Sequence, residues 1–402
     1  MLILSVPENI LLFLCGFGLL QGILLAALLY FHPRADRSVT TFLALYIACV
    51  SVPILIPLGQ HLFSWQTIMF IEPTIIFIGP LLYFYVRSFR ETITWRKAWP
   101  HLVIFIPYAL VAWWSYVHIG LKYPRTVDVP PEAAHHPSSY VPVTIRFIQR
   151  LVYYFLTRRE LNTYRRSIRN LFSDISRINL NWVRWLNNSI LIILFVIMIL
   201  YIMILRYTEH IGLWLLICGC MVTIYIYLAA WRGITQPTIW QIQPGIDREG
   251  VETLMAEAEP TSAAAAPVSK GPRPRRGGLS EARLDEITTR IITLMEVDKV
   301  YQNPELTLQQ LASTLQLSIH HLSQAINDGL QKSFYDLVNG YRVGEAKRLL
   351  MDDKDINYTI LAIGFEAGFN SKTTFNTVFK KFTGFTPSEF RQHQNEAALI
   401  TN

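Results

Sequence analysis

The sequence predicts an all-α fold in which a seven-helix transmembrane bundle precedes a cytoplasmic all-α domain with two similar helix pairs. Composition is the first reason: 51% of the 402 residues are hydrophobic and only 16% are charged, whereas soluble globular proteins carry about 25% charged residues. The second reason is that the apolar residues concentrate before about residue 232. The third is that Lys and Arg lie mainly in alternate loops of this apolar half.

Six stretches are apolar and long enough to be membrane spans, because a bilayer core of about 30 Å needs roughly 20 apolar residues in a helix, and a seventh stretch is shorter. They cover residues 10–31, 41–59, 67–86, 99–121, 140–156, 186–205 and 211–231. The fifth is the shortest and contains Arg146 and Arg150, so six spans are the alternative. The first is too long for the apolar core of a signal peptide and follows no basic segment, so we expect it to remain as a span.

The distribution of positive charge decides between six and seven spans. With seven spans, the loops on one side contain 13 Lys and Arg residues and the loops on the other side contain 3. Because Lys and Arg are enriched in cytoplasmic loops, seven spans place the N-terminus outside and everything after residue 231 in the cytoplasm. Six spans would place the C-terminal half outside. We therefore predict a transmembrane sensor domain at residues 1–231.

Residues 232–282 are predicted to be a cytoplasmic linker. Within it, residues 257–278 consist mainly of Ala, Pro, Gly and Ser without an apolar period, a composition typical of a disordered tether. A basic cluster in this tether either binds anionic lipid headgroups or is simply solvated. The cluster contains Lys270, Arg273, Arg275 and Arg276.

Residues 283–394 have the length of one soluble domain, followed by a tail at residues 395–402. The first helix pair covers about residues 306–328, and its first helix has apolar residues at helical spacing. They are Leu308, Leu311, Ala312 and Leu315. Ser318 is a suitable N-cap for the second helix, which Leu322 and Ile326 anchor. An amphipathic joining helix follows at about residues 333–350.

The second helix pair covers about residues 359–382. Gly368 suits a turn with positive φ, and Ser371 is the expected N-cap of the following helix. That helix has a predicted buried stripe at positions i, i+3, i+4 and i+7: Phe375, Val378, Phe379 and Phe382. Both pairs have the helix-turn-helix arrangement, and the joining helix can separate them by roughly one turn of DNA.

With this layout, residues 306–391 resemble the AraC/XylS family of bacterial transcription regulators. The resemblance rests on the joining helix, on the run Ile363-Gly-Phe-Glu-Ala-Gly-Phe369 and on the C-terminal end. The matching positions outside that run are Arg342, Ala346, Leu350, Phe379, Lys380, Lys381, Gly384, Pro387, Phe390 and Arg391. The whole chain is similar to the subgroup in which membrane spans replace a soluble sensor, which implies the bacterial cytoplasmic (inner) membrane. The chain departs from the family at Gly364, where alanine is usual, and at Gln324 and Thr377, where arginine is frequent.

The resemblance implies that the second helix of each pair enters the major groove of promoter DNA. The expected base-reading residues are Ile319, His320, Ser323 and Gln324 in the first pair and Lys372, Thr373, Asn376 and Thr377 in the second. Gln and Asn can pair bidentately with adenine, Lys can bond guanine, and the Thr methyl group can contact thymine. Lys380, Lys381 and Arg391 are expected to contact phosphates.

The charge of this domain argues for modest DNA affinity. Residues 283–393 contain 12 Lys and Arg against 13 Asp and Glu, a net charge of −1, whereas strong non-specific DNA binders are basic. We therefore expect binding to depend on a homodimer or on clustering.

Glu72 and Arg146 are ionisable residues inside predicted spans, where charged groups are costly and often functional. We predict that they pair around a pocket for an unknown signal ligand. The alternatives are a protonated Glu72 in a packed bundle and an Arg146 that reaches the headgroups. Gly18 and Gly22 form a G-x-x-x-G motif typical of close helix contacts.

No cofactor or metal is expected. The four cysteines all lie in predicted spans and lack the spacing of zinc or redox sites; they are Cys15, Cys49, Cys218 and Cys220. The spans also lack paired carboxylates, H-E-x-x-H and a phosphate loop, so we predict no enzyme. The favoured function is a membrane-bound transcription regulator. Two alternatives stay open: a transporter or receptor with a regulatory helical tail, and an adaptor that binds proteins rather than DNA.

Overall fold

The computed structural model describes residues 6–31, 37–62, 71–122, 137–176, 178–206, 211–234, 279–352 and 358–400. The elements in these ranges are helices, apart from one isolated β-bridge between Phe172 and Thr307. Residues 235–278, which are most of the predicted linker and include the whole predicted tether at 257–278, lie outside them. The chain forms two compact units: Met1–Tyr164 with Leu180–Glu252, and Arg165–Asn179 with Thr253–Asn402. The all-α prediction is thus confirmed for the described residues.

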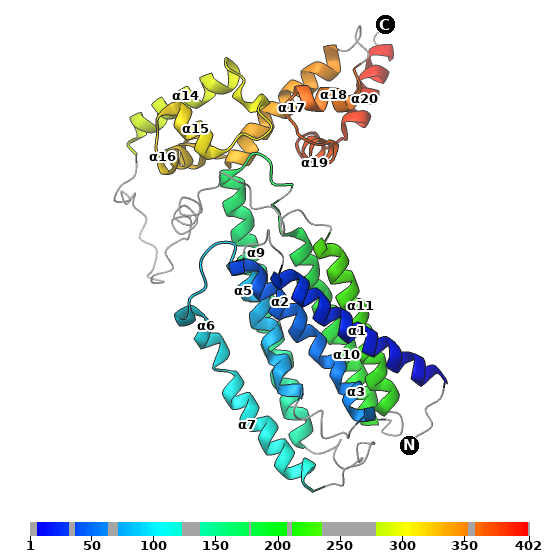
Figure 1. Cartoon of the computed structure of the whole chain (residues 1–402). Coiled ribbons are helices and arrows are strands. Elements are labelled where there is room, and N and C mark those ends of the chain that lie inside the picture. Colours follow the sequence, from blue (N-terminus) through cyan, green and yellow to red (C-terminus); the bar gives the residue numbers. More distant parts are fainter. Residues whose placement is uncertain are drawn as a thin grey trace. The chain divides into compact units, whose positions relative to one another are not determined.

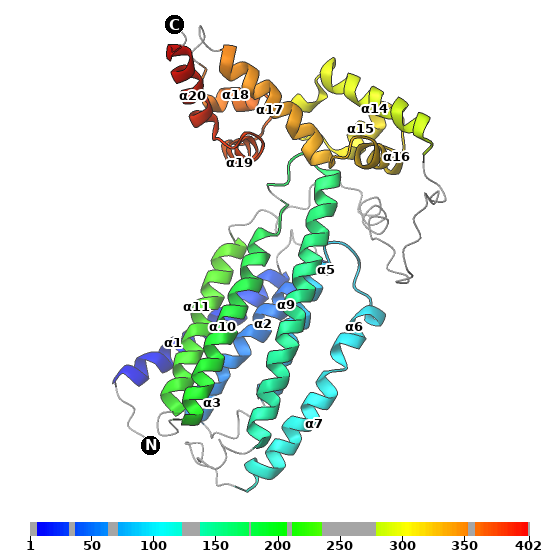
Figure 2. The same ribbon diagram turned by 180° about the vertical axis from the view of Figure 1, so that it is seen from behind.

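The first unit is a helical bundle (Figures 1 and 2). Its helices before the long central helix are α1 (Val6–Phe31), α2 (Arg37–Ser51), α3 (Leu55–Leu62), α5 (Ile78–Arg87), α6 (Trp95–Leu102) and α7 (Phe105–Ser115). The later ones are α9 (Pro137–Leu171), α10 (Asn181–Arg206) and α11 (Ile211–Ile234). α9 continues past the boundary between the units, so its last turns, from Arg165, belong to the second unit.

The glycines of the G-x-x-x-G motif mark close contacts of α1 with two neighbours. A Cβ atom at Gly18 would overlap the side chain of Thr223 on α11, and one at Gly22 would overlap Ser51 on α2. Small residues at these positions let the helices approach closely. The predicted helix contact is confirmed, and it lies within this chain.

Prolines explain the interruptions of the predicted spans. The second span is divided by a 3-10 turn, η1 (Val52–Ile54), which contains Pro53. The described part of the third span contains the 3-10 helix η2 (Glu72–Phe77), which includes Pro73. Pro80 in α5 has no N–H to donate to the carbonyl of Ile76 four residues earlier. The side chain of Gln149 on α9 donates to that carbonyl instead, at 3.0 Å.

Four helical stretches of the described residues are long and apolar enough to cross a membrane: Asn9–Phe31, Arg37–Gly59, Trp95–Ile119 and Asn181–Leu200. They correspond to the first, second, fourth and sixth predicted spans. Within the described residues, the other three predicted spans are also helical but do not reach that length and hydropathy. η2 and α5 form a short interrupted pair, α9 continues into a charged segment, and the apolar part of α11 is limited to Leu213–Ala229.

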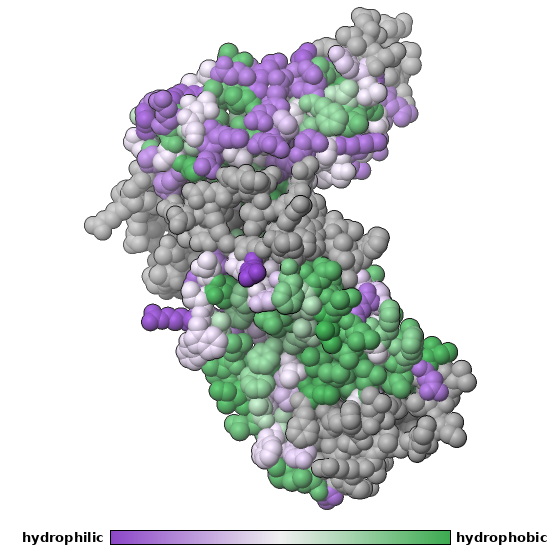
Figure 3. Space-filling view, viewed as in Figure 1, coloured by the Kyte–Doolittle hydropathy of each residue, from purple (hydrophilic) through white to green (hydrophobic). Residues whose placement is uncertain are grey.

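Hydrophobic residues dominate the surface drawn for the first unit, whereas the second unit is mainly hydrophilic (Figure 3). Large apolar side chains point outward from α1, α7 and α10; examples are Phe13, Leu110 and Ile192, at 73%, 64% and 65% exposure. Apolar patches of this extent on a soluble protein mark membrane or partner contacts.

The second unit is built around helix α17 (Phe334–Asp352), which lies between two groups of helices in both views (Figures 1 and 2). One group contains α14 (Glu281–Glu296), η5 (Val300–Gln302), α15 (Leu308–Leu315), α16 (Ile319–Gln324) and the π-helical turn η6 (Ala325–Gly329). The other contains α18 (Ile360–Glu366), α19 (Lys372–Thr383) and α20 (Pro387–Ile400).

Candidate nucleic-acid interface

In the first helix pair, α15 and α16 are joined by a three-residue turn. Thr307 and Gln310 form a reciprocal capping box at the start of α15, and Gln316 ends it in the left-handed conformation with φ 56°. The predicted N-cap Ser318 accepts a hydrogen bond from the backbone N–H of His321 at 3.2 Å. All the predicted apolar anchors of this pair are buried. α16 ends at Gln324 and continues directly into the π-helical turn η6, so the helical segment reaches Gly329, close to the predicted end at about residue 328.

The second helix pair has the same local construction. Thr359 caps α18 and Ser371 caps α19, and each side chain accepts a backbone N–H three residues on. Gly368 has φ +92°, as predicted, and a Cβ atom there would come within 2.6 Å of the carbonyl oxygen of Tyr301. Phe375, Val378 and Phe379 are buried, but Phe382 is 39% exposed. The prediction for Phe382 is therefore wrong, because this last turn of α19 extends beyond the core.

Gly364 is explained by its neighbour on the facing helix. A Cβ atom at Gly364 would lie 2.6 Å from Cδ1 of Phe375, and the ring of Phe375 is 1% exposed in the core. Glycine at this position therefore makes room for a buried aromatic ring. This is the physical reason for one departure from the family pattern.

The predicted base-reading residues of α16 differ in accessibility. His320 is exposed, whereas Ile319, Ser323 and Gln324 are half-buried. The side-chain oxygen of Gln324 is buried without a hydrogen-bond partner in the described residues, and the hydroxyl of Ser323 accepts from Asn327 at 3.3 Å. An adenine contact by Gln324 would therefore require its amide to turn outward.

The predicted residues of α19 are more accessible. Lys372, Thr373 and Thr377 are exposed, and Asn376 is half-buried between them. α19 is a regular α-helix over Lys372–Thr383, whereas α16 changes to the π-helical turn η6 after Gln324. Of the two second helices, α19 thus presents the more complete set of polar side chains for a groove.

The three predicted phosphate-contacting residues lie in different surroundings. Lys380 is exposed in the last turn of α19. Lys381 forms an ion pair with Asp336 on α17, with 2.6 Å between Nζ and Oδ1. Arg391 on α20 donates a hydrogen bond of 3.2 Å to the carbonyl oxygen of Tyr358. Lys380 and Lys381 are thus both exposed, but Lys381 is engaged by Asp336, while Arg391 helps to hold the chain that enters α18.

Asp336 is held by several groups at once. Arg169, in the last turn of α9, donates from Nη2 to both carboxylate oxygens at 2.8 Å, and Ser333 donates to Oδ2 at 2.7 Å. Burial alone would raise the pKa of this carboxyl, but the hydrogen bonds from Lys381 and Ser333 and the charge of Arg169 together lower it. Asp336 is thus a carboxylate shared by two cations from distant parts of the chain.

Residues 165–179 are integrated into the second unit through Ser173. Its hydroxyl donates to the carbonyl oxygen of Leu306 at 2.6 Å, and its own carbonyl oxygen accepts from Asn339 at 2.8 Å. Arg342 donates to the Ser173 hydroxyl at 3.2 Å and to the carbonyls of Tyr301 and Asn303. The span pattern of the sequence assigns residues 165–179 to the membrane half; the structure groups them with the second unit.

Arg342 is 1% exposed, and burial lowers its pKa to about 10. The family resemblance singles out Arg342 without indicating what it contacts. The arginine-rich composition around Arg169 indicates only on which side of the membrane this loop lies. Neither observation predicts the contact with Ser173, because polar contacts of an irregular segment have no sequence period.

In the first unit, the predicted pair of ionisable residues is present. Nη2 of Arg146 lies 2.6 Å from Oε1 of Glu72, and both side chains are about one-fifth exposed. That a signal ligand binds at this ion pair remains a prediction.

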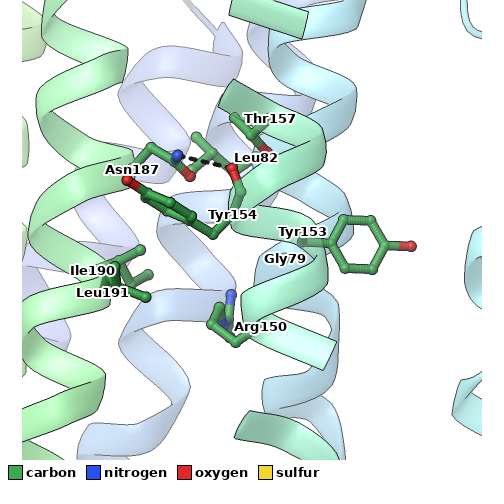
Figure 4. Close-up of a pocket in the computed structure, with 9 residues that line it drawn as sticks. All are labelled: Gly79, Leu82, Arg150, Tyr153, Tyr154, Thr157, Asn187, Ile190 and Leu191. Atoms are coloured by element: carbon green, nitrogen blue, oxygen red, sulfur yellow. Dashed lines mark hydrogen bonds between the residues drawn. The ribbon is translucent and has the colours of Figure 1, made fainter. Parts of the chain in front are cut away.

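One turn further along α9, Arg150 lines a small pocket between α5, α9 and α10 (Figure 4). Arg150 is 7% exposed and donates to the carbonyl oxygen of Ile75 at 3.3 Å. Asn187 donates to the carbonyl oxygen of Tyr154 at 3.2 Å inside the pocket, while the ring of Tyr153 points away from it. The lining residues are Gly79, Leu82, Arg150, Tyr153, Tyr154, Thr157, Asn187, Ile190 and Leu191.

Comparison with known proteins locates the similarity in the second unit. The family model described as "Helix-turn-helix domain" matches residues 311–393. An uncharacterized HTH-type transcriptional regulator of Staphylococcus aureus (strain COL) is 30% identical over 93 residues, which cover 23% of this chain and 12% of the relative. The chain therefore matches only a small part of that curated relative.

Two solved structures are similar to part of this chain. One is a protein of unknown function from Listeria innocua, with 25% identity, a TM-score of 0.24, and coverage of 26% of this chain and 95% of that one. The other is the C-terminal domain of AraT, a response regulator from Geobacillus stearothermophilus, with 30% identity, a TM-score of 0.25, and coverage of 28% and 88%. From the capped helix pairs and the family match, residues 311–393 of this chain are a helix-turn-helix domain of the AraC type.

Proposed function

We propose that this chain is a membrane-bound one-component transcription regulator, which senses a signal through its transmembrane helices and binds promoter DNA through two helix-turn-helix units. The observation that carries the proposal is the pair of capped second helices, α16 and α19, in a domain that matches a helix-turn-helix family. Regulators of this kind read bases with exposed side chains of such helices. The polar face of α19, with Lys372, Thr373, Asn376 and Thr377, is the main reading surface.

Two observations together support a cytoplasmic location for this domain. The charge asymmetry of the seven-span arrangement places the arginine-rich segment between the fifth and sixth spans inside. Residues 165–179 lie in that segment and belong to the same compact unit as the helix-turn-helix domain. A segment and a domain that fold together must lie on the same side of the bilayer, here the cytoplasmic side of the bacterial inner membrane.

The sensing site is proposed to lie near the ion pair of Glu72 and Arg146 and the neighbouring pocket at Arg150. A guanidinium in apolar surroundings favours an anionic partner, because its planar donors match carboxylate and phosphate oxygens. A ligand with such a group could compete for Arg146 or occupy the pocket. The basic tether would bind the membrane lipid, and a homodimer would raise the modest DNA affinity that the net charge of −1 predicts.

The proposal is tested on the full-length chain in lipid nanodiscs, with DNA duplexes selected from a random-sequence pool. We expect sequence-specific retention of duplex and a reporter fused after Asn402 that is active only in the cytoplasm. A reporter active only outside the cytoplasm, or nanodiscs that retain no duplex at low salt, would overturn the proposal. The second outcome would favour the alternative of a transporter or receptor whose helical tail binds proteins.

A further inference from the structure

The carboxylate of Asp336 is the point where the segment after the fifth predicted span meets the reading helix. It accepts hydrogen bonds from Arg169 in the last turn of α9 and from Lys381 in the last turn of α19. Both cations also lie over the ring of Tyr335, at 5.2 Å for Arg169 and 5.3 Å for Lys381. Two positive groups thus share one acidic and aromatic site on α17.

We infer that Arg169 is a positioning residue for Lys381: by neutralising Asp336, it lets Lys381 leave this carboxylate and contact a DNA phosphate. The inference rests on the proposed DNA binding. A single carboxylate holds one cation more tightly when the other is removed, because the remaining pair is no longer weakened by repulsion between the two positive charges. Without Arg169, Lys381 stays longer on Asp336 and contacts the DNA less often.

The position of Arg169 in the chain gives this site a regulatory use. α9 begins in the first unit at Pro137 and ends in the second unit at Leu171. Any change in the first unit that moves or rotates this continuous helix also moves Arg169. DNA binding is favoured when Arg169 contacts Asp336 and disfavoured when Arg169 has moved away from it.

The energies of these ion pairs are large enough to modulate DNA affinity but too small to switch DNA binding on and off. Side-chain exposures are 31% for Arg169, 29% for Asp336 and 47% for Lys381, so the ion pairs are partly screened by solvent. The pair strengths usual for such groups correspond to roughly two- to five-fold changes in an equilibrium constant. We expect effects of this size on DNA affinity.

The test measures DNA affinity against salt concentration for the full-length chain in nanodiscs, with a duplex that the wild-type chain selects from a random-sequence pool. Each phosphate contact contributes about 0.9 to the slope of log affinity against log salt. Lys381→Gln should reduce the slope by about 0.9. Arg169→Gln should weaken binding about two- to five-fold and shift the slope toward that of Lys381→Gln. Asp336→Asn should strengthen binding and keep the full slope.

The double variants separate positioning from general damage. Because Arg169 acts through Asp336, Arg169→Gln should not change DNA affinity in an Asp336→Asn background. It should not change DNA affinity in a Lys381→Gln background either, and this second background serves if the Asp336 variant does not fold. Arg166→Gln, an exposed arginine on the same helix, removes the same charge as a matched control and should leave the slope unchanged. Loss of affinity that persists in both backgrounds, or no loss in Arg169→Gln alone, would overturn the inference. Failure of the wild-type chain to bind any duplex would instead reject the proposed function.

Discussion

The guanidinium of Arg342 donates a hydrogen bond of 3.2 Å to the hydroxyl of Ser173, although 169 residues separate them in the chain. The same guanidinium donates to the carbonyl oxygens of Tyr301 and Asn303, at 2.8 and 2.7 Å. One buried side chain on the joining helix therefore holds the segment that follows α9 and the chain that enters α15. This arrangement makes residues 165–179 a structural part of the helix-turn-helix domain.

Arg342→Lys should destabilise the second unit by about 1–3 kcal/mol, because a single ammonium group cannot serve all three acceptors and a buried acceptor without a partner costs that much. Pulse proteolysis of the full-length protein in detergent measures the change in unfolding free energy. Arg348→Lys is the matched control. Arg348 lies on the same helix, but its side chain is 53% exposed and it pairs with Glu345 one turn away, so its change should stay within about 0.5 kcal/mol. Equal effects of the two substitutions would contradict the role of Arg342.

Gly364→Ala should destabilise the domain, although helix propensity alone favours alanine by up to about 1 kcal/mol. The added methyl group would lie 2.6 Å from the buried ring of Phe375, and overpacking of a core usually costs about 1–3 kcal/mol. A methyl group added at Gly344 in α17 would meet open space, with no neighbouring side chain within 4 Å, so Gly344→Ala should instead stabilise the protein. Thermal unfolding of both variants compares the two effects. A stabilising Gly364→Ala would show that Phe375 moves at no cost.

The helices and caps of the second unit follow from local sequence, and this explains what could be predicted. Ser318 and Ser371 cap their helices through contacts three residues away, and Leu311 and Phe379 follow helical periods, so each signal is complete within a few residues. Phe382 fits the same helical period but lies beyond the core. The spacing of apolar residues does not show at which turn of a helix the core ends. The change from α-helix to π-helix after Gln324 is a similar limit, because the apolar spacing does not distinguish the two.

The residues of the candidate sites could be predicted only in part, and the reason is different. Glu72 and Arg146 stood out because charged residues are rare in apolar spans, and the structure places them 2.6 Å apart. Ser173 and Asp336 are ordinary polar residues in the sequence. Their importance arises from contacts with residues 45 to 169 positions away, which one sequence does not reveal.

Asn376→Ala should weaken binding to a selected duplex by about 1–3 kcal/mol and relax base preference at one position, because it removes a bidentate contact with adenine. Gln324→Ala should act in the same way at a different base pair, provided that the Gln324 amide turns outward on binding. Gln309→Ala, an exposed glutamine on α15, is the control and should change neither affinity nor preference. Competition binding with duplexes mutated at each position measures both quantities. Unchanged base preference in Asn376→Ala would reject α19 as a reading helix.

Lys380→Gln and Arg391→Gln should have different consequences, although the sequence suggests the same role for both residues. Lys380 is exposed on α19, so its loss should lower the salt slope of DNA binding by about 0.9 and weaken all duplexes equally. Arg391 donates to the carbonyl oxygen of Tyr358, so its loss should lower the thermal stability and leave the slope unchanged. Salt titrations and melting curves of the two variants distinguish these effects. A slope change in Arg391→Gln alone would reverse the assignment.

The ion pair in the first unit predicts a rescue by charge exchange. Glu72→Arg and Arg146→Glu should each abolish the response of a target-promoter reporter, since each leaves two like charges facing each other inside the bundle. The double exchange should restore part of the response. A double variant whose loss equals the sum of the single losses would show that the pair does not couple the two positions.

The central claim is that this chain reads chromosomal DNA while it resides in the membrane. Genome-wide mapping of the sites bound by the intact protein in its native host tests it most directly. We expect enrichment at a small set of promoters that disappears in a Lys372→Ala/Asn376→Ala variant of equal abundance in the membrane fraction. Enrichment that is absent in the wild type, or unchanged in the variant, would contradict the account.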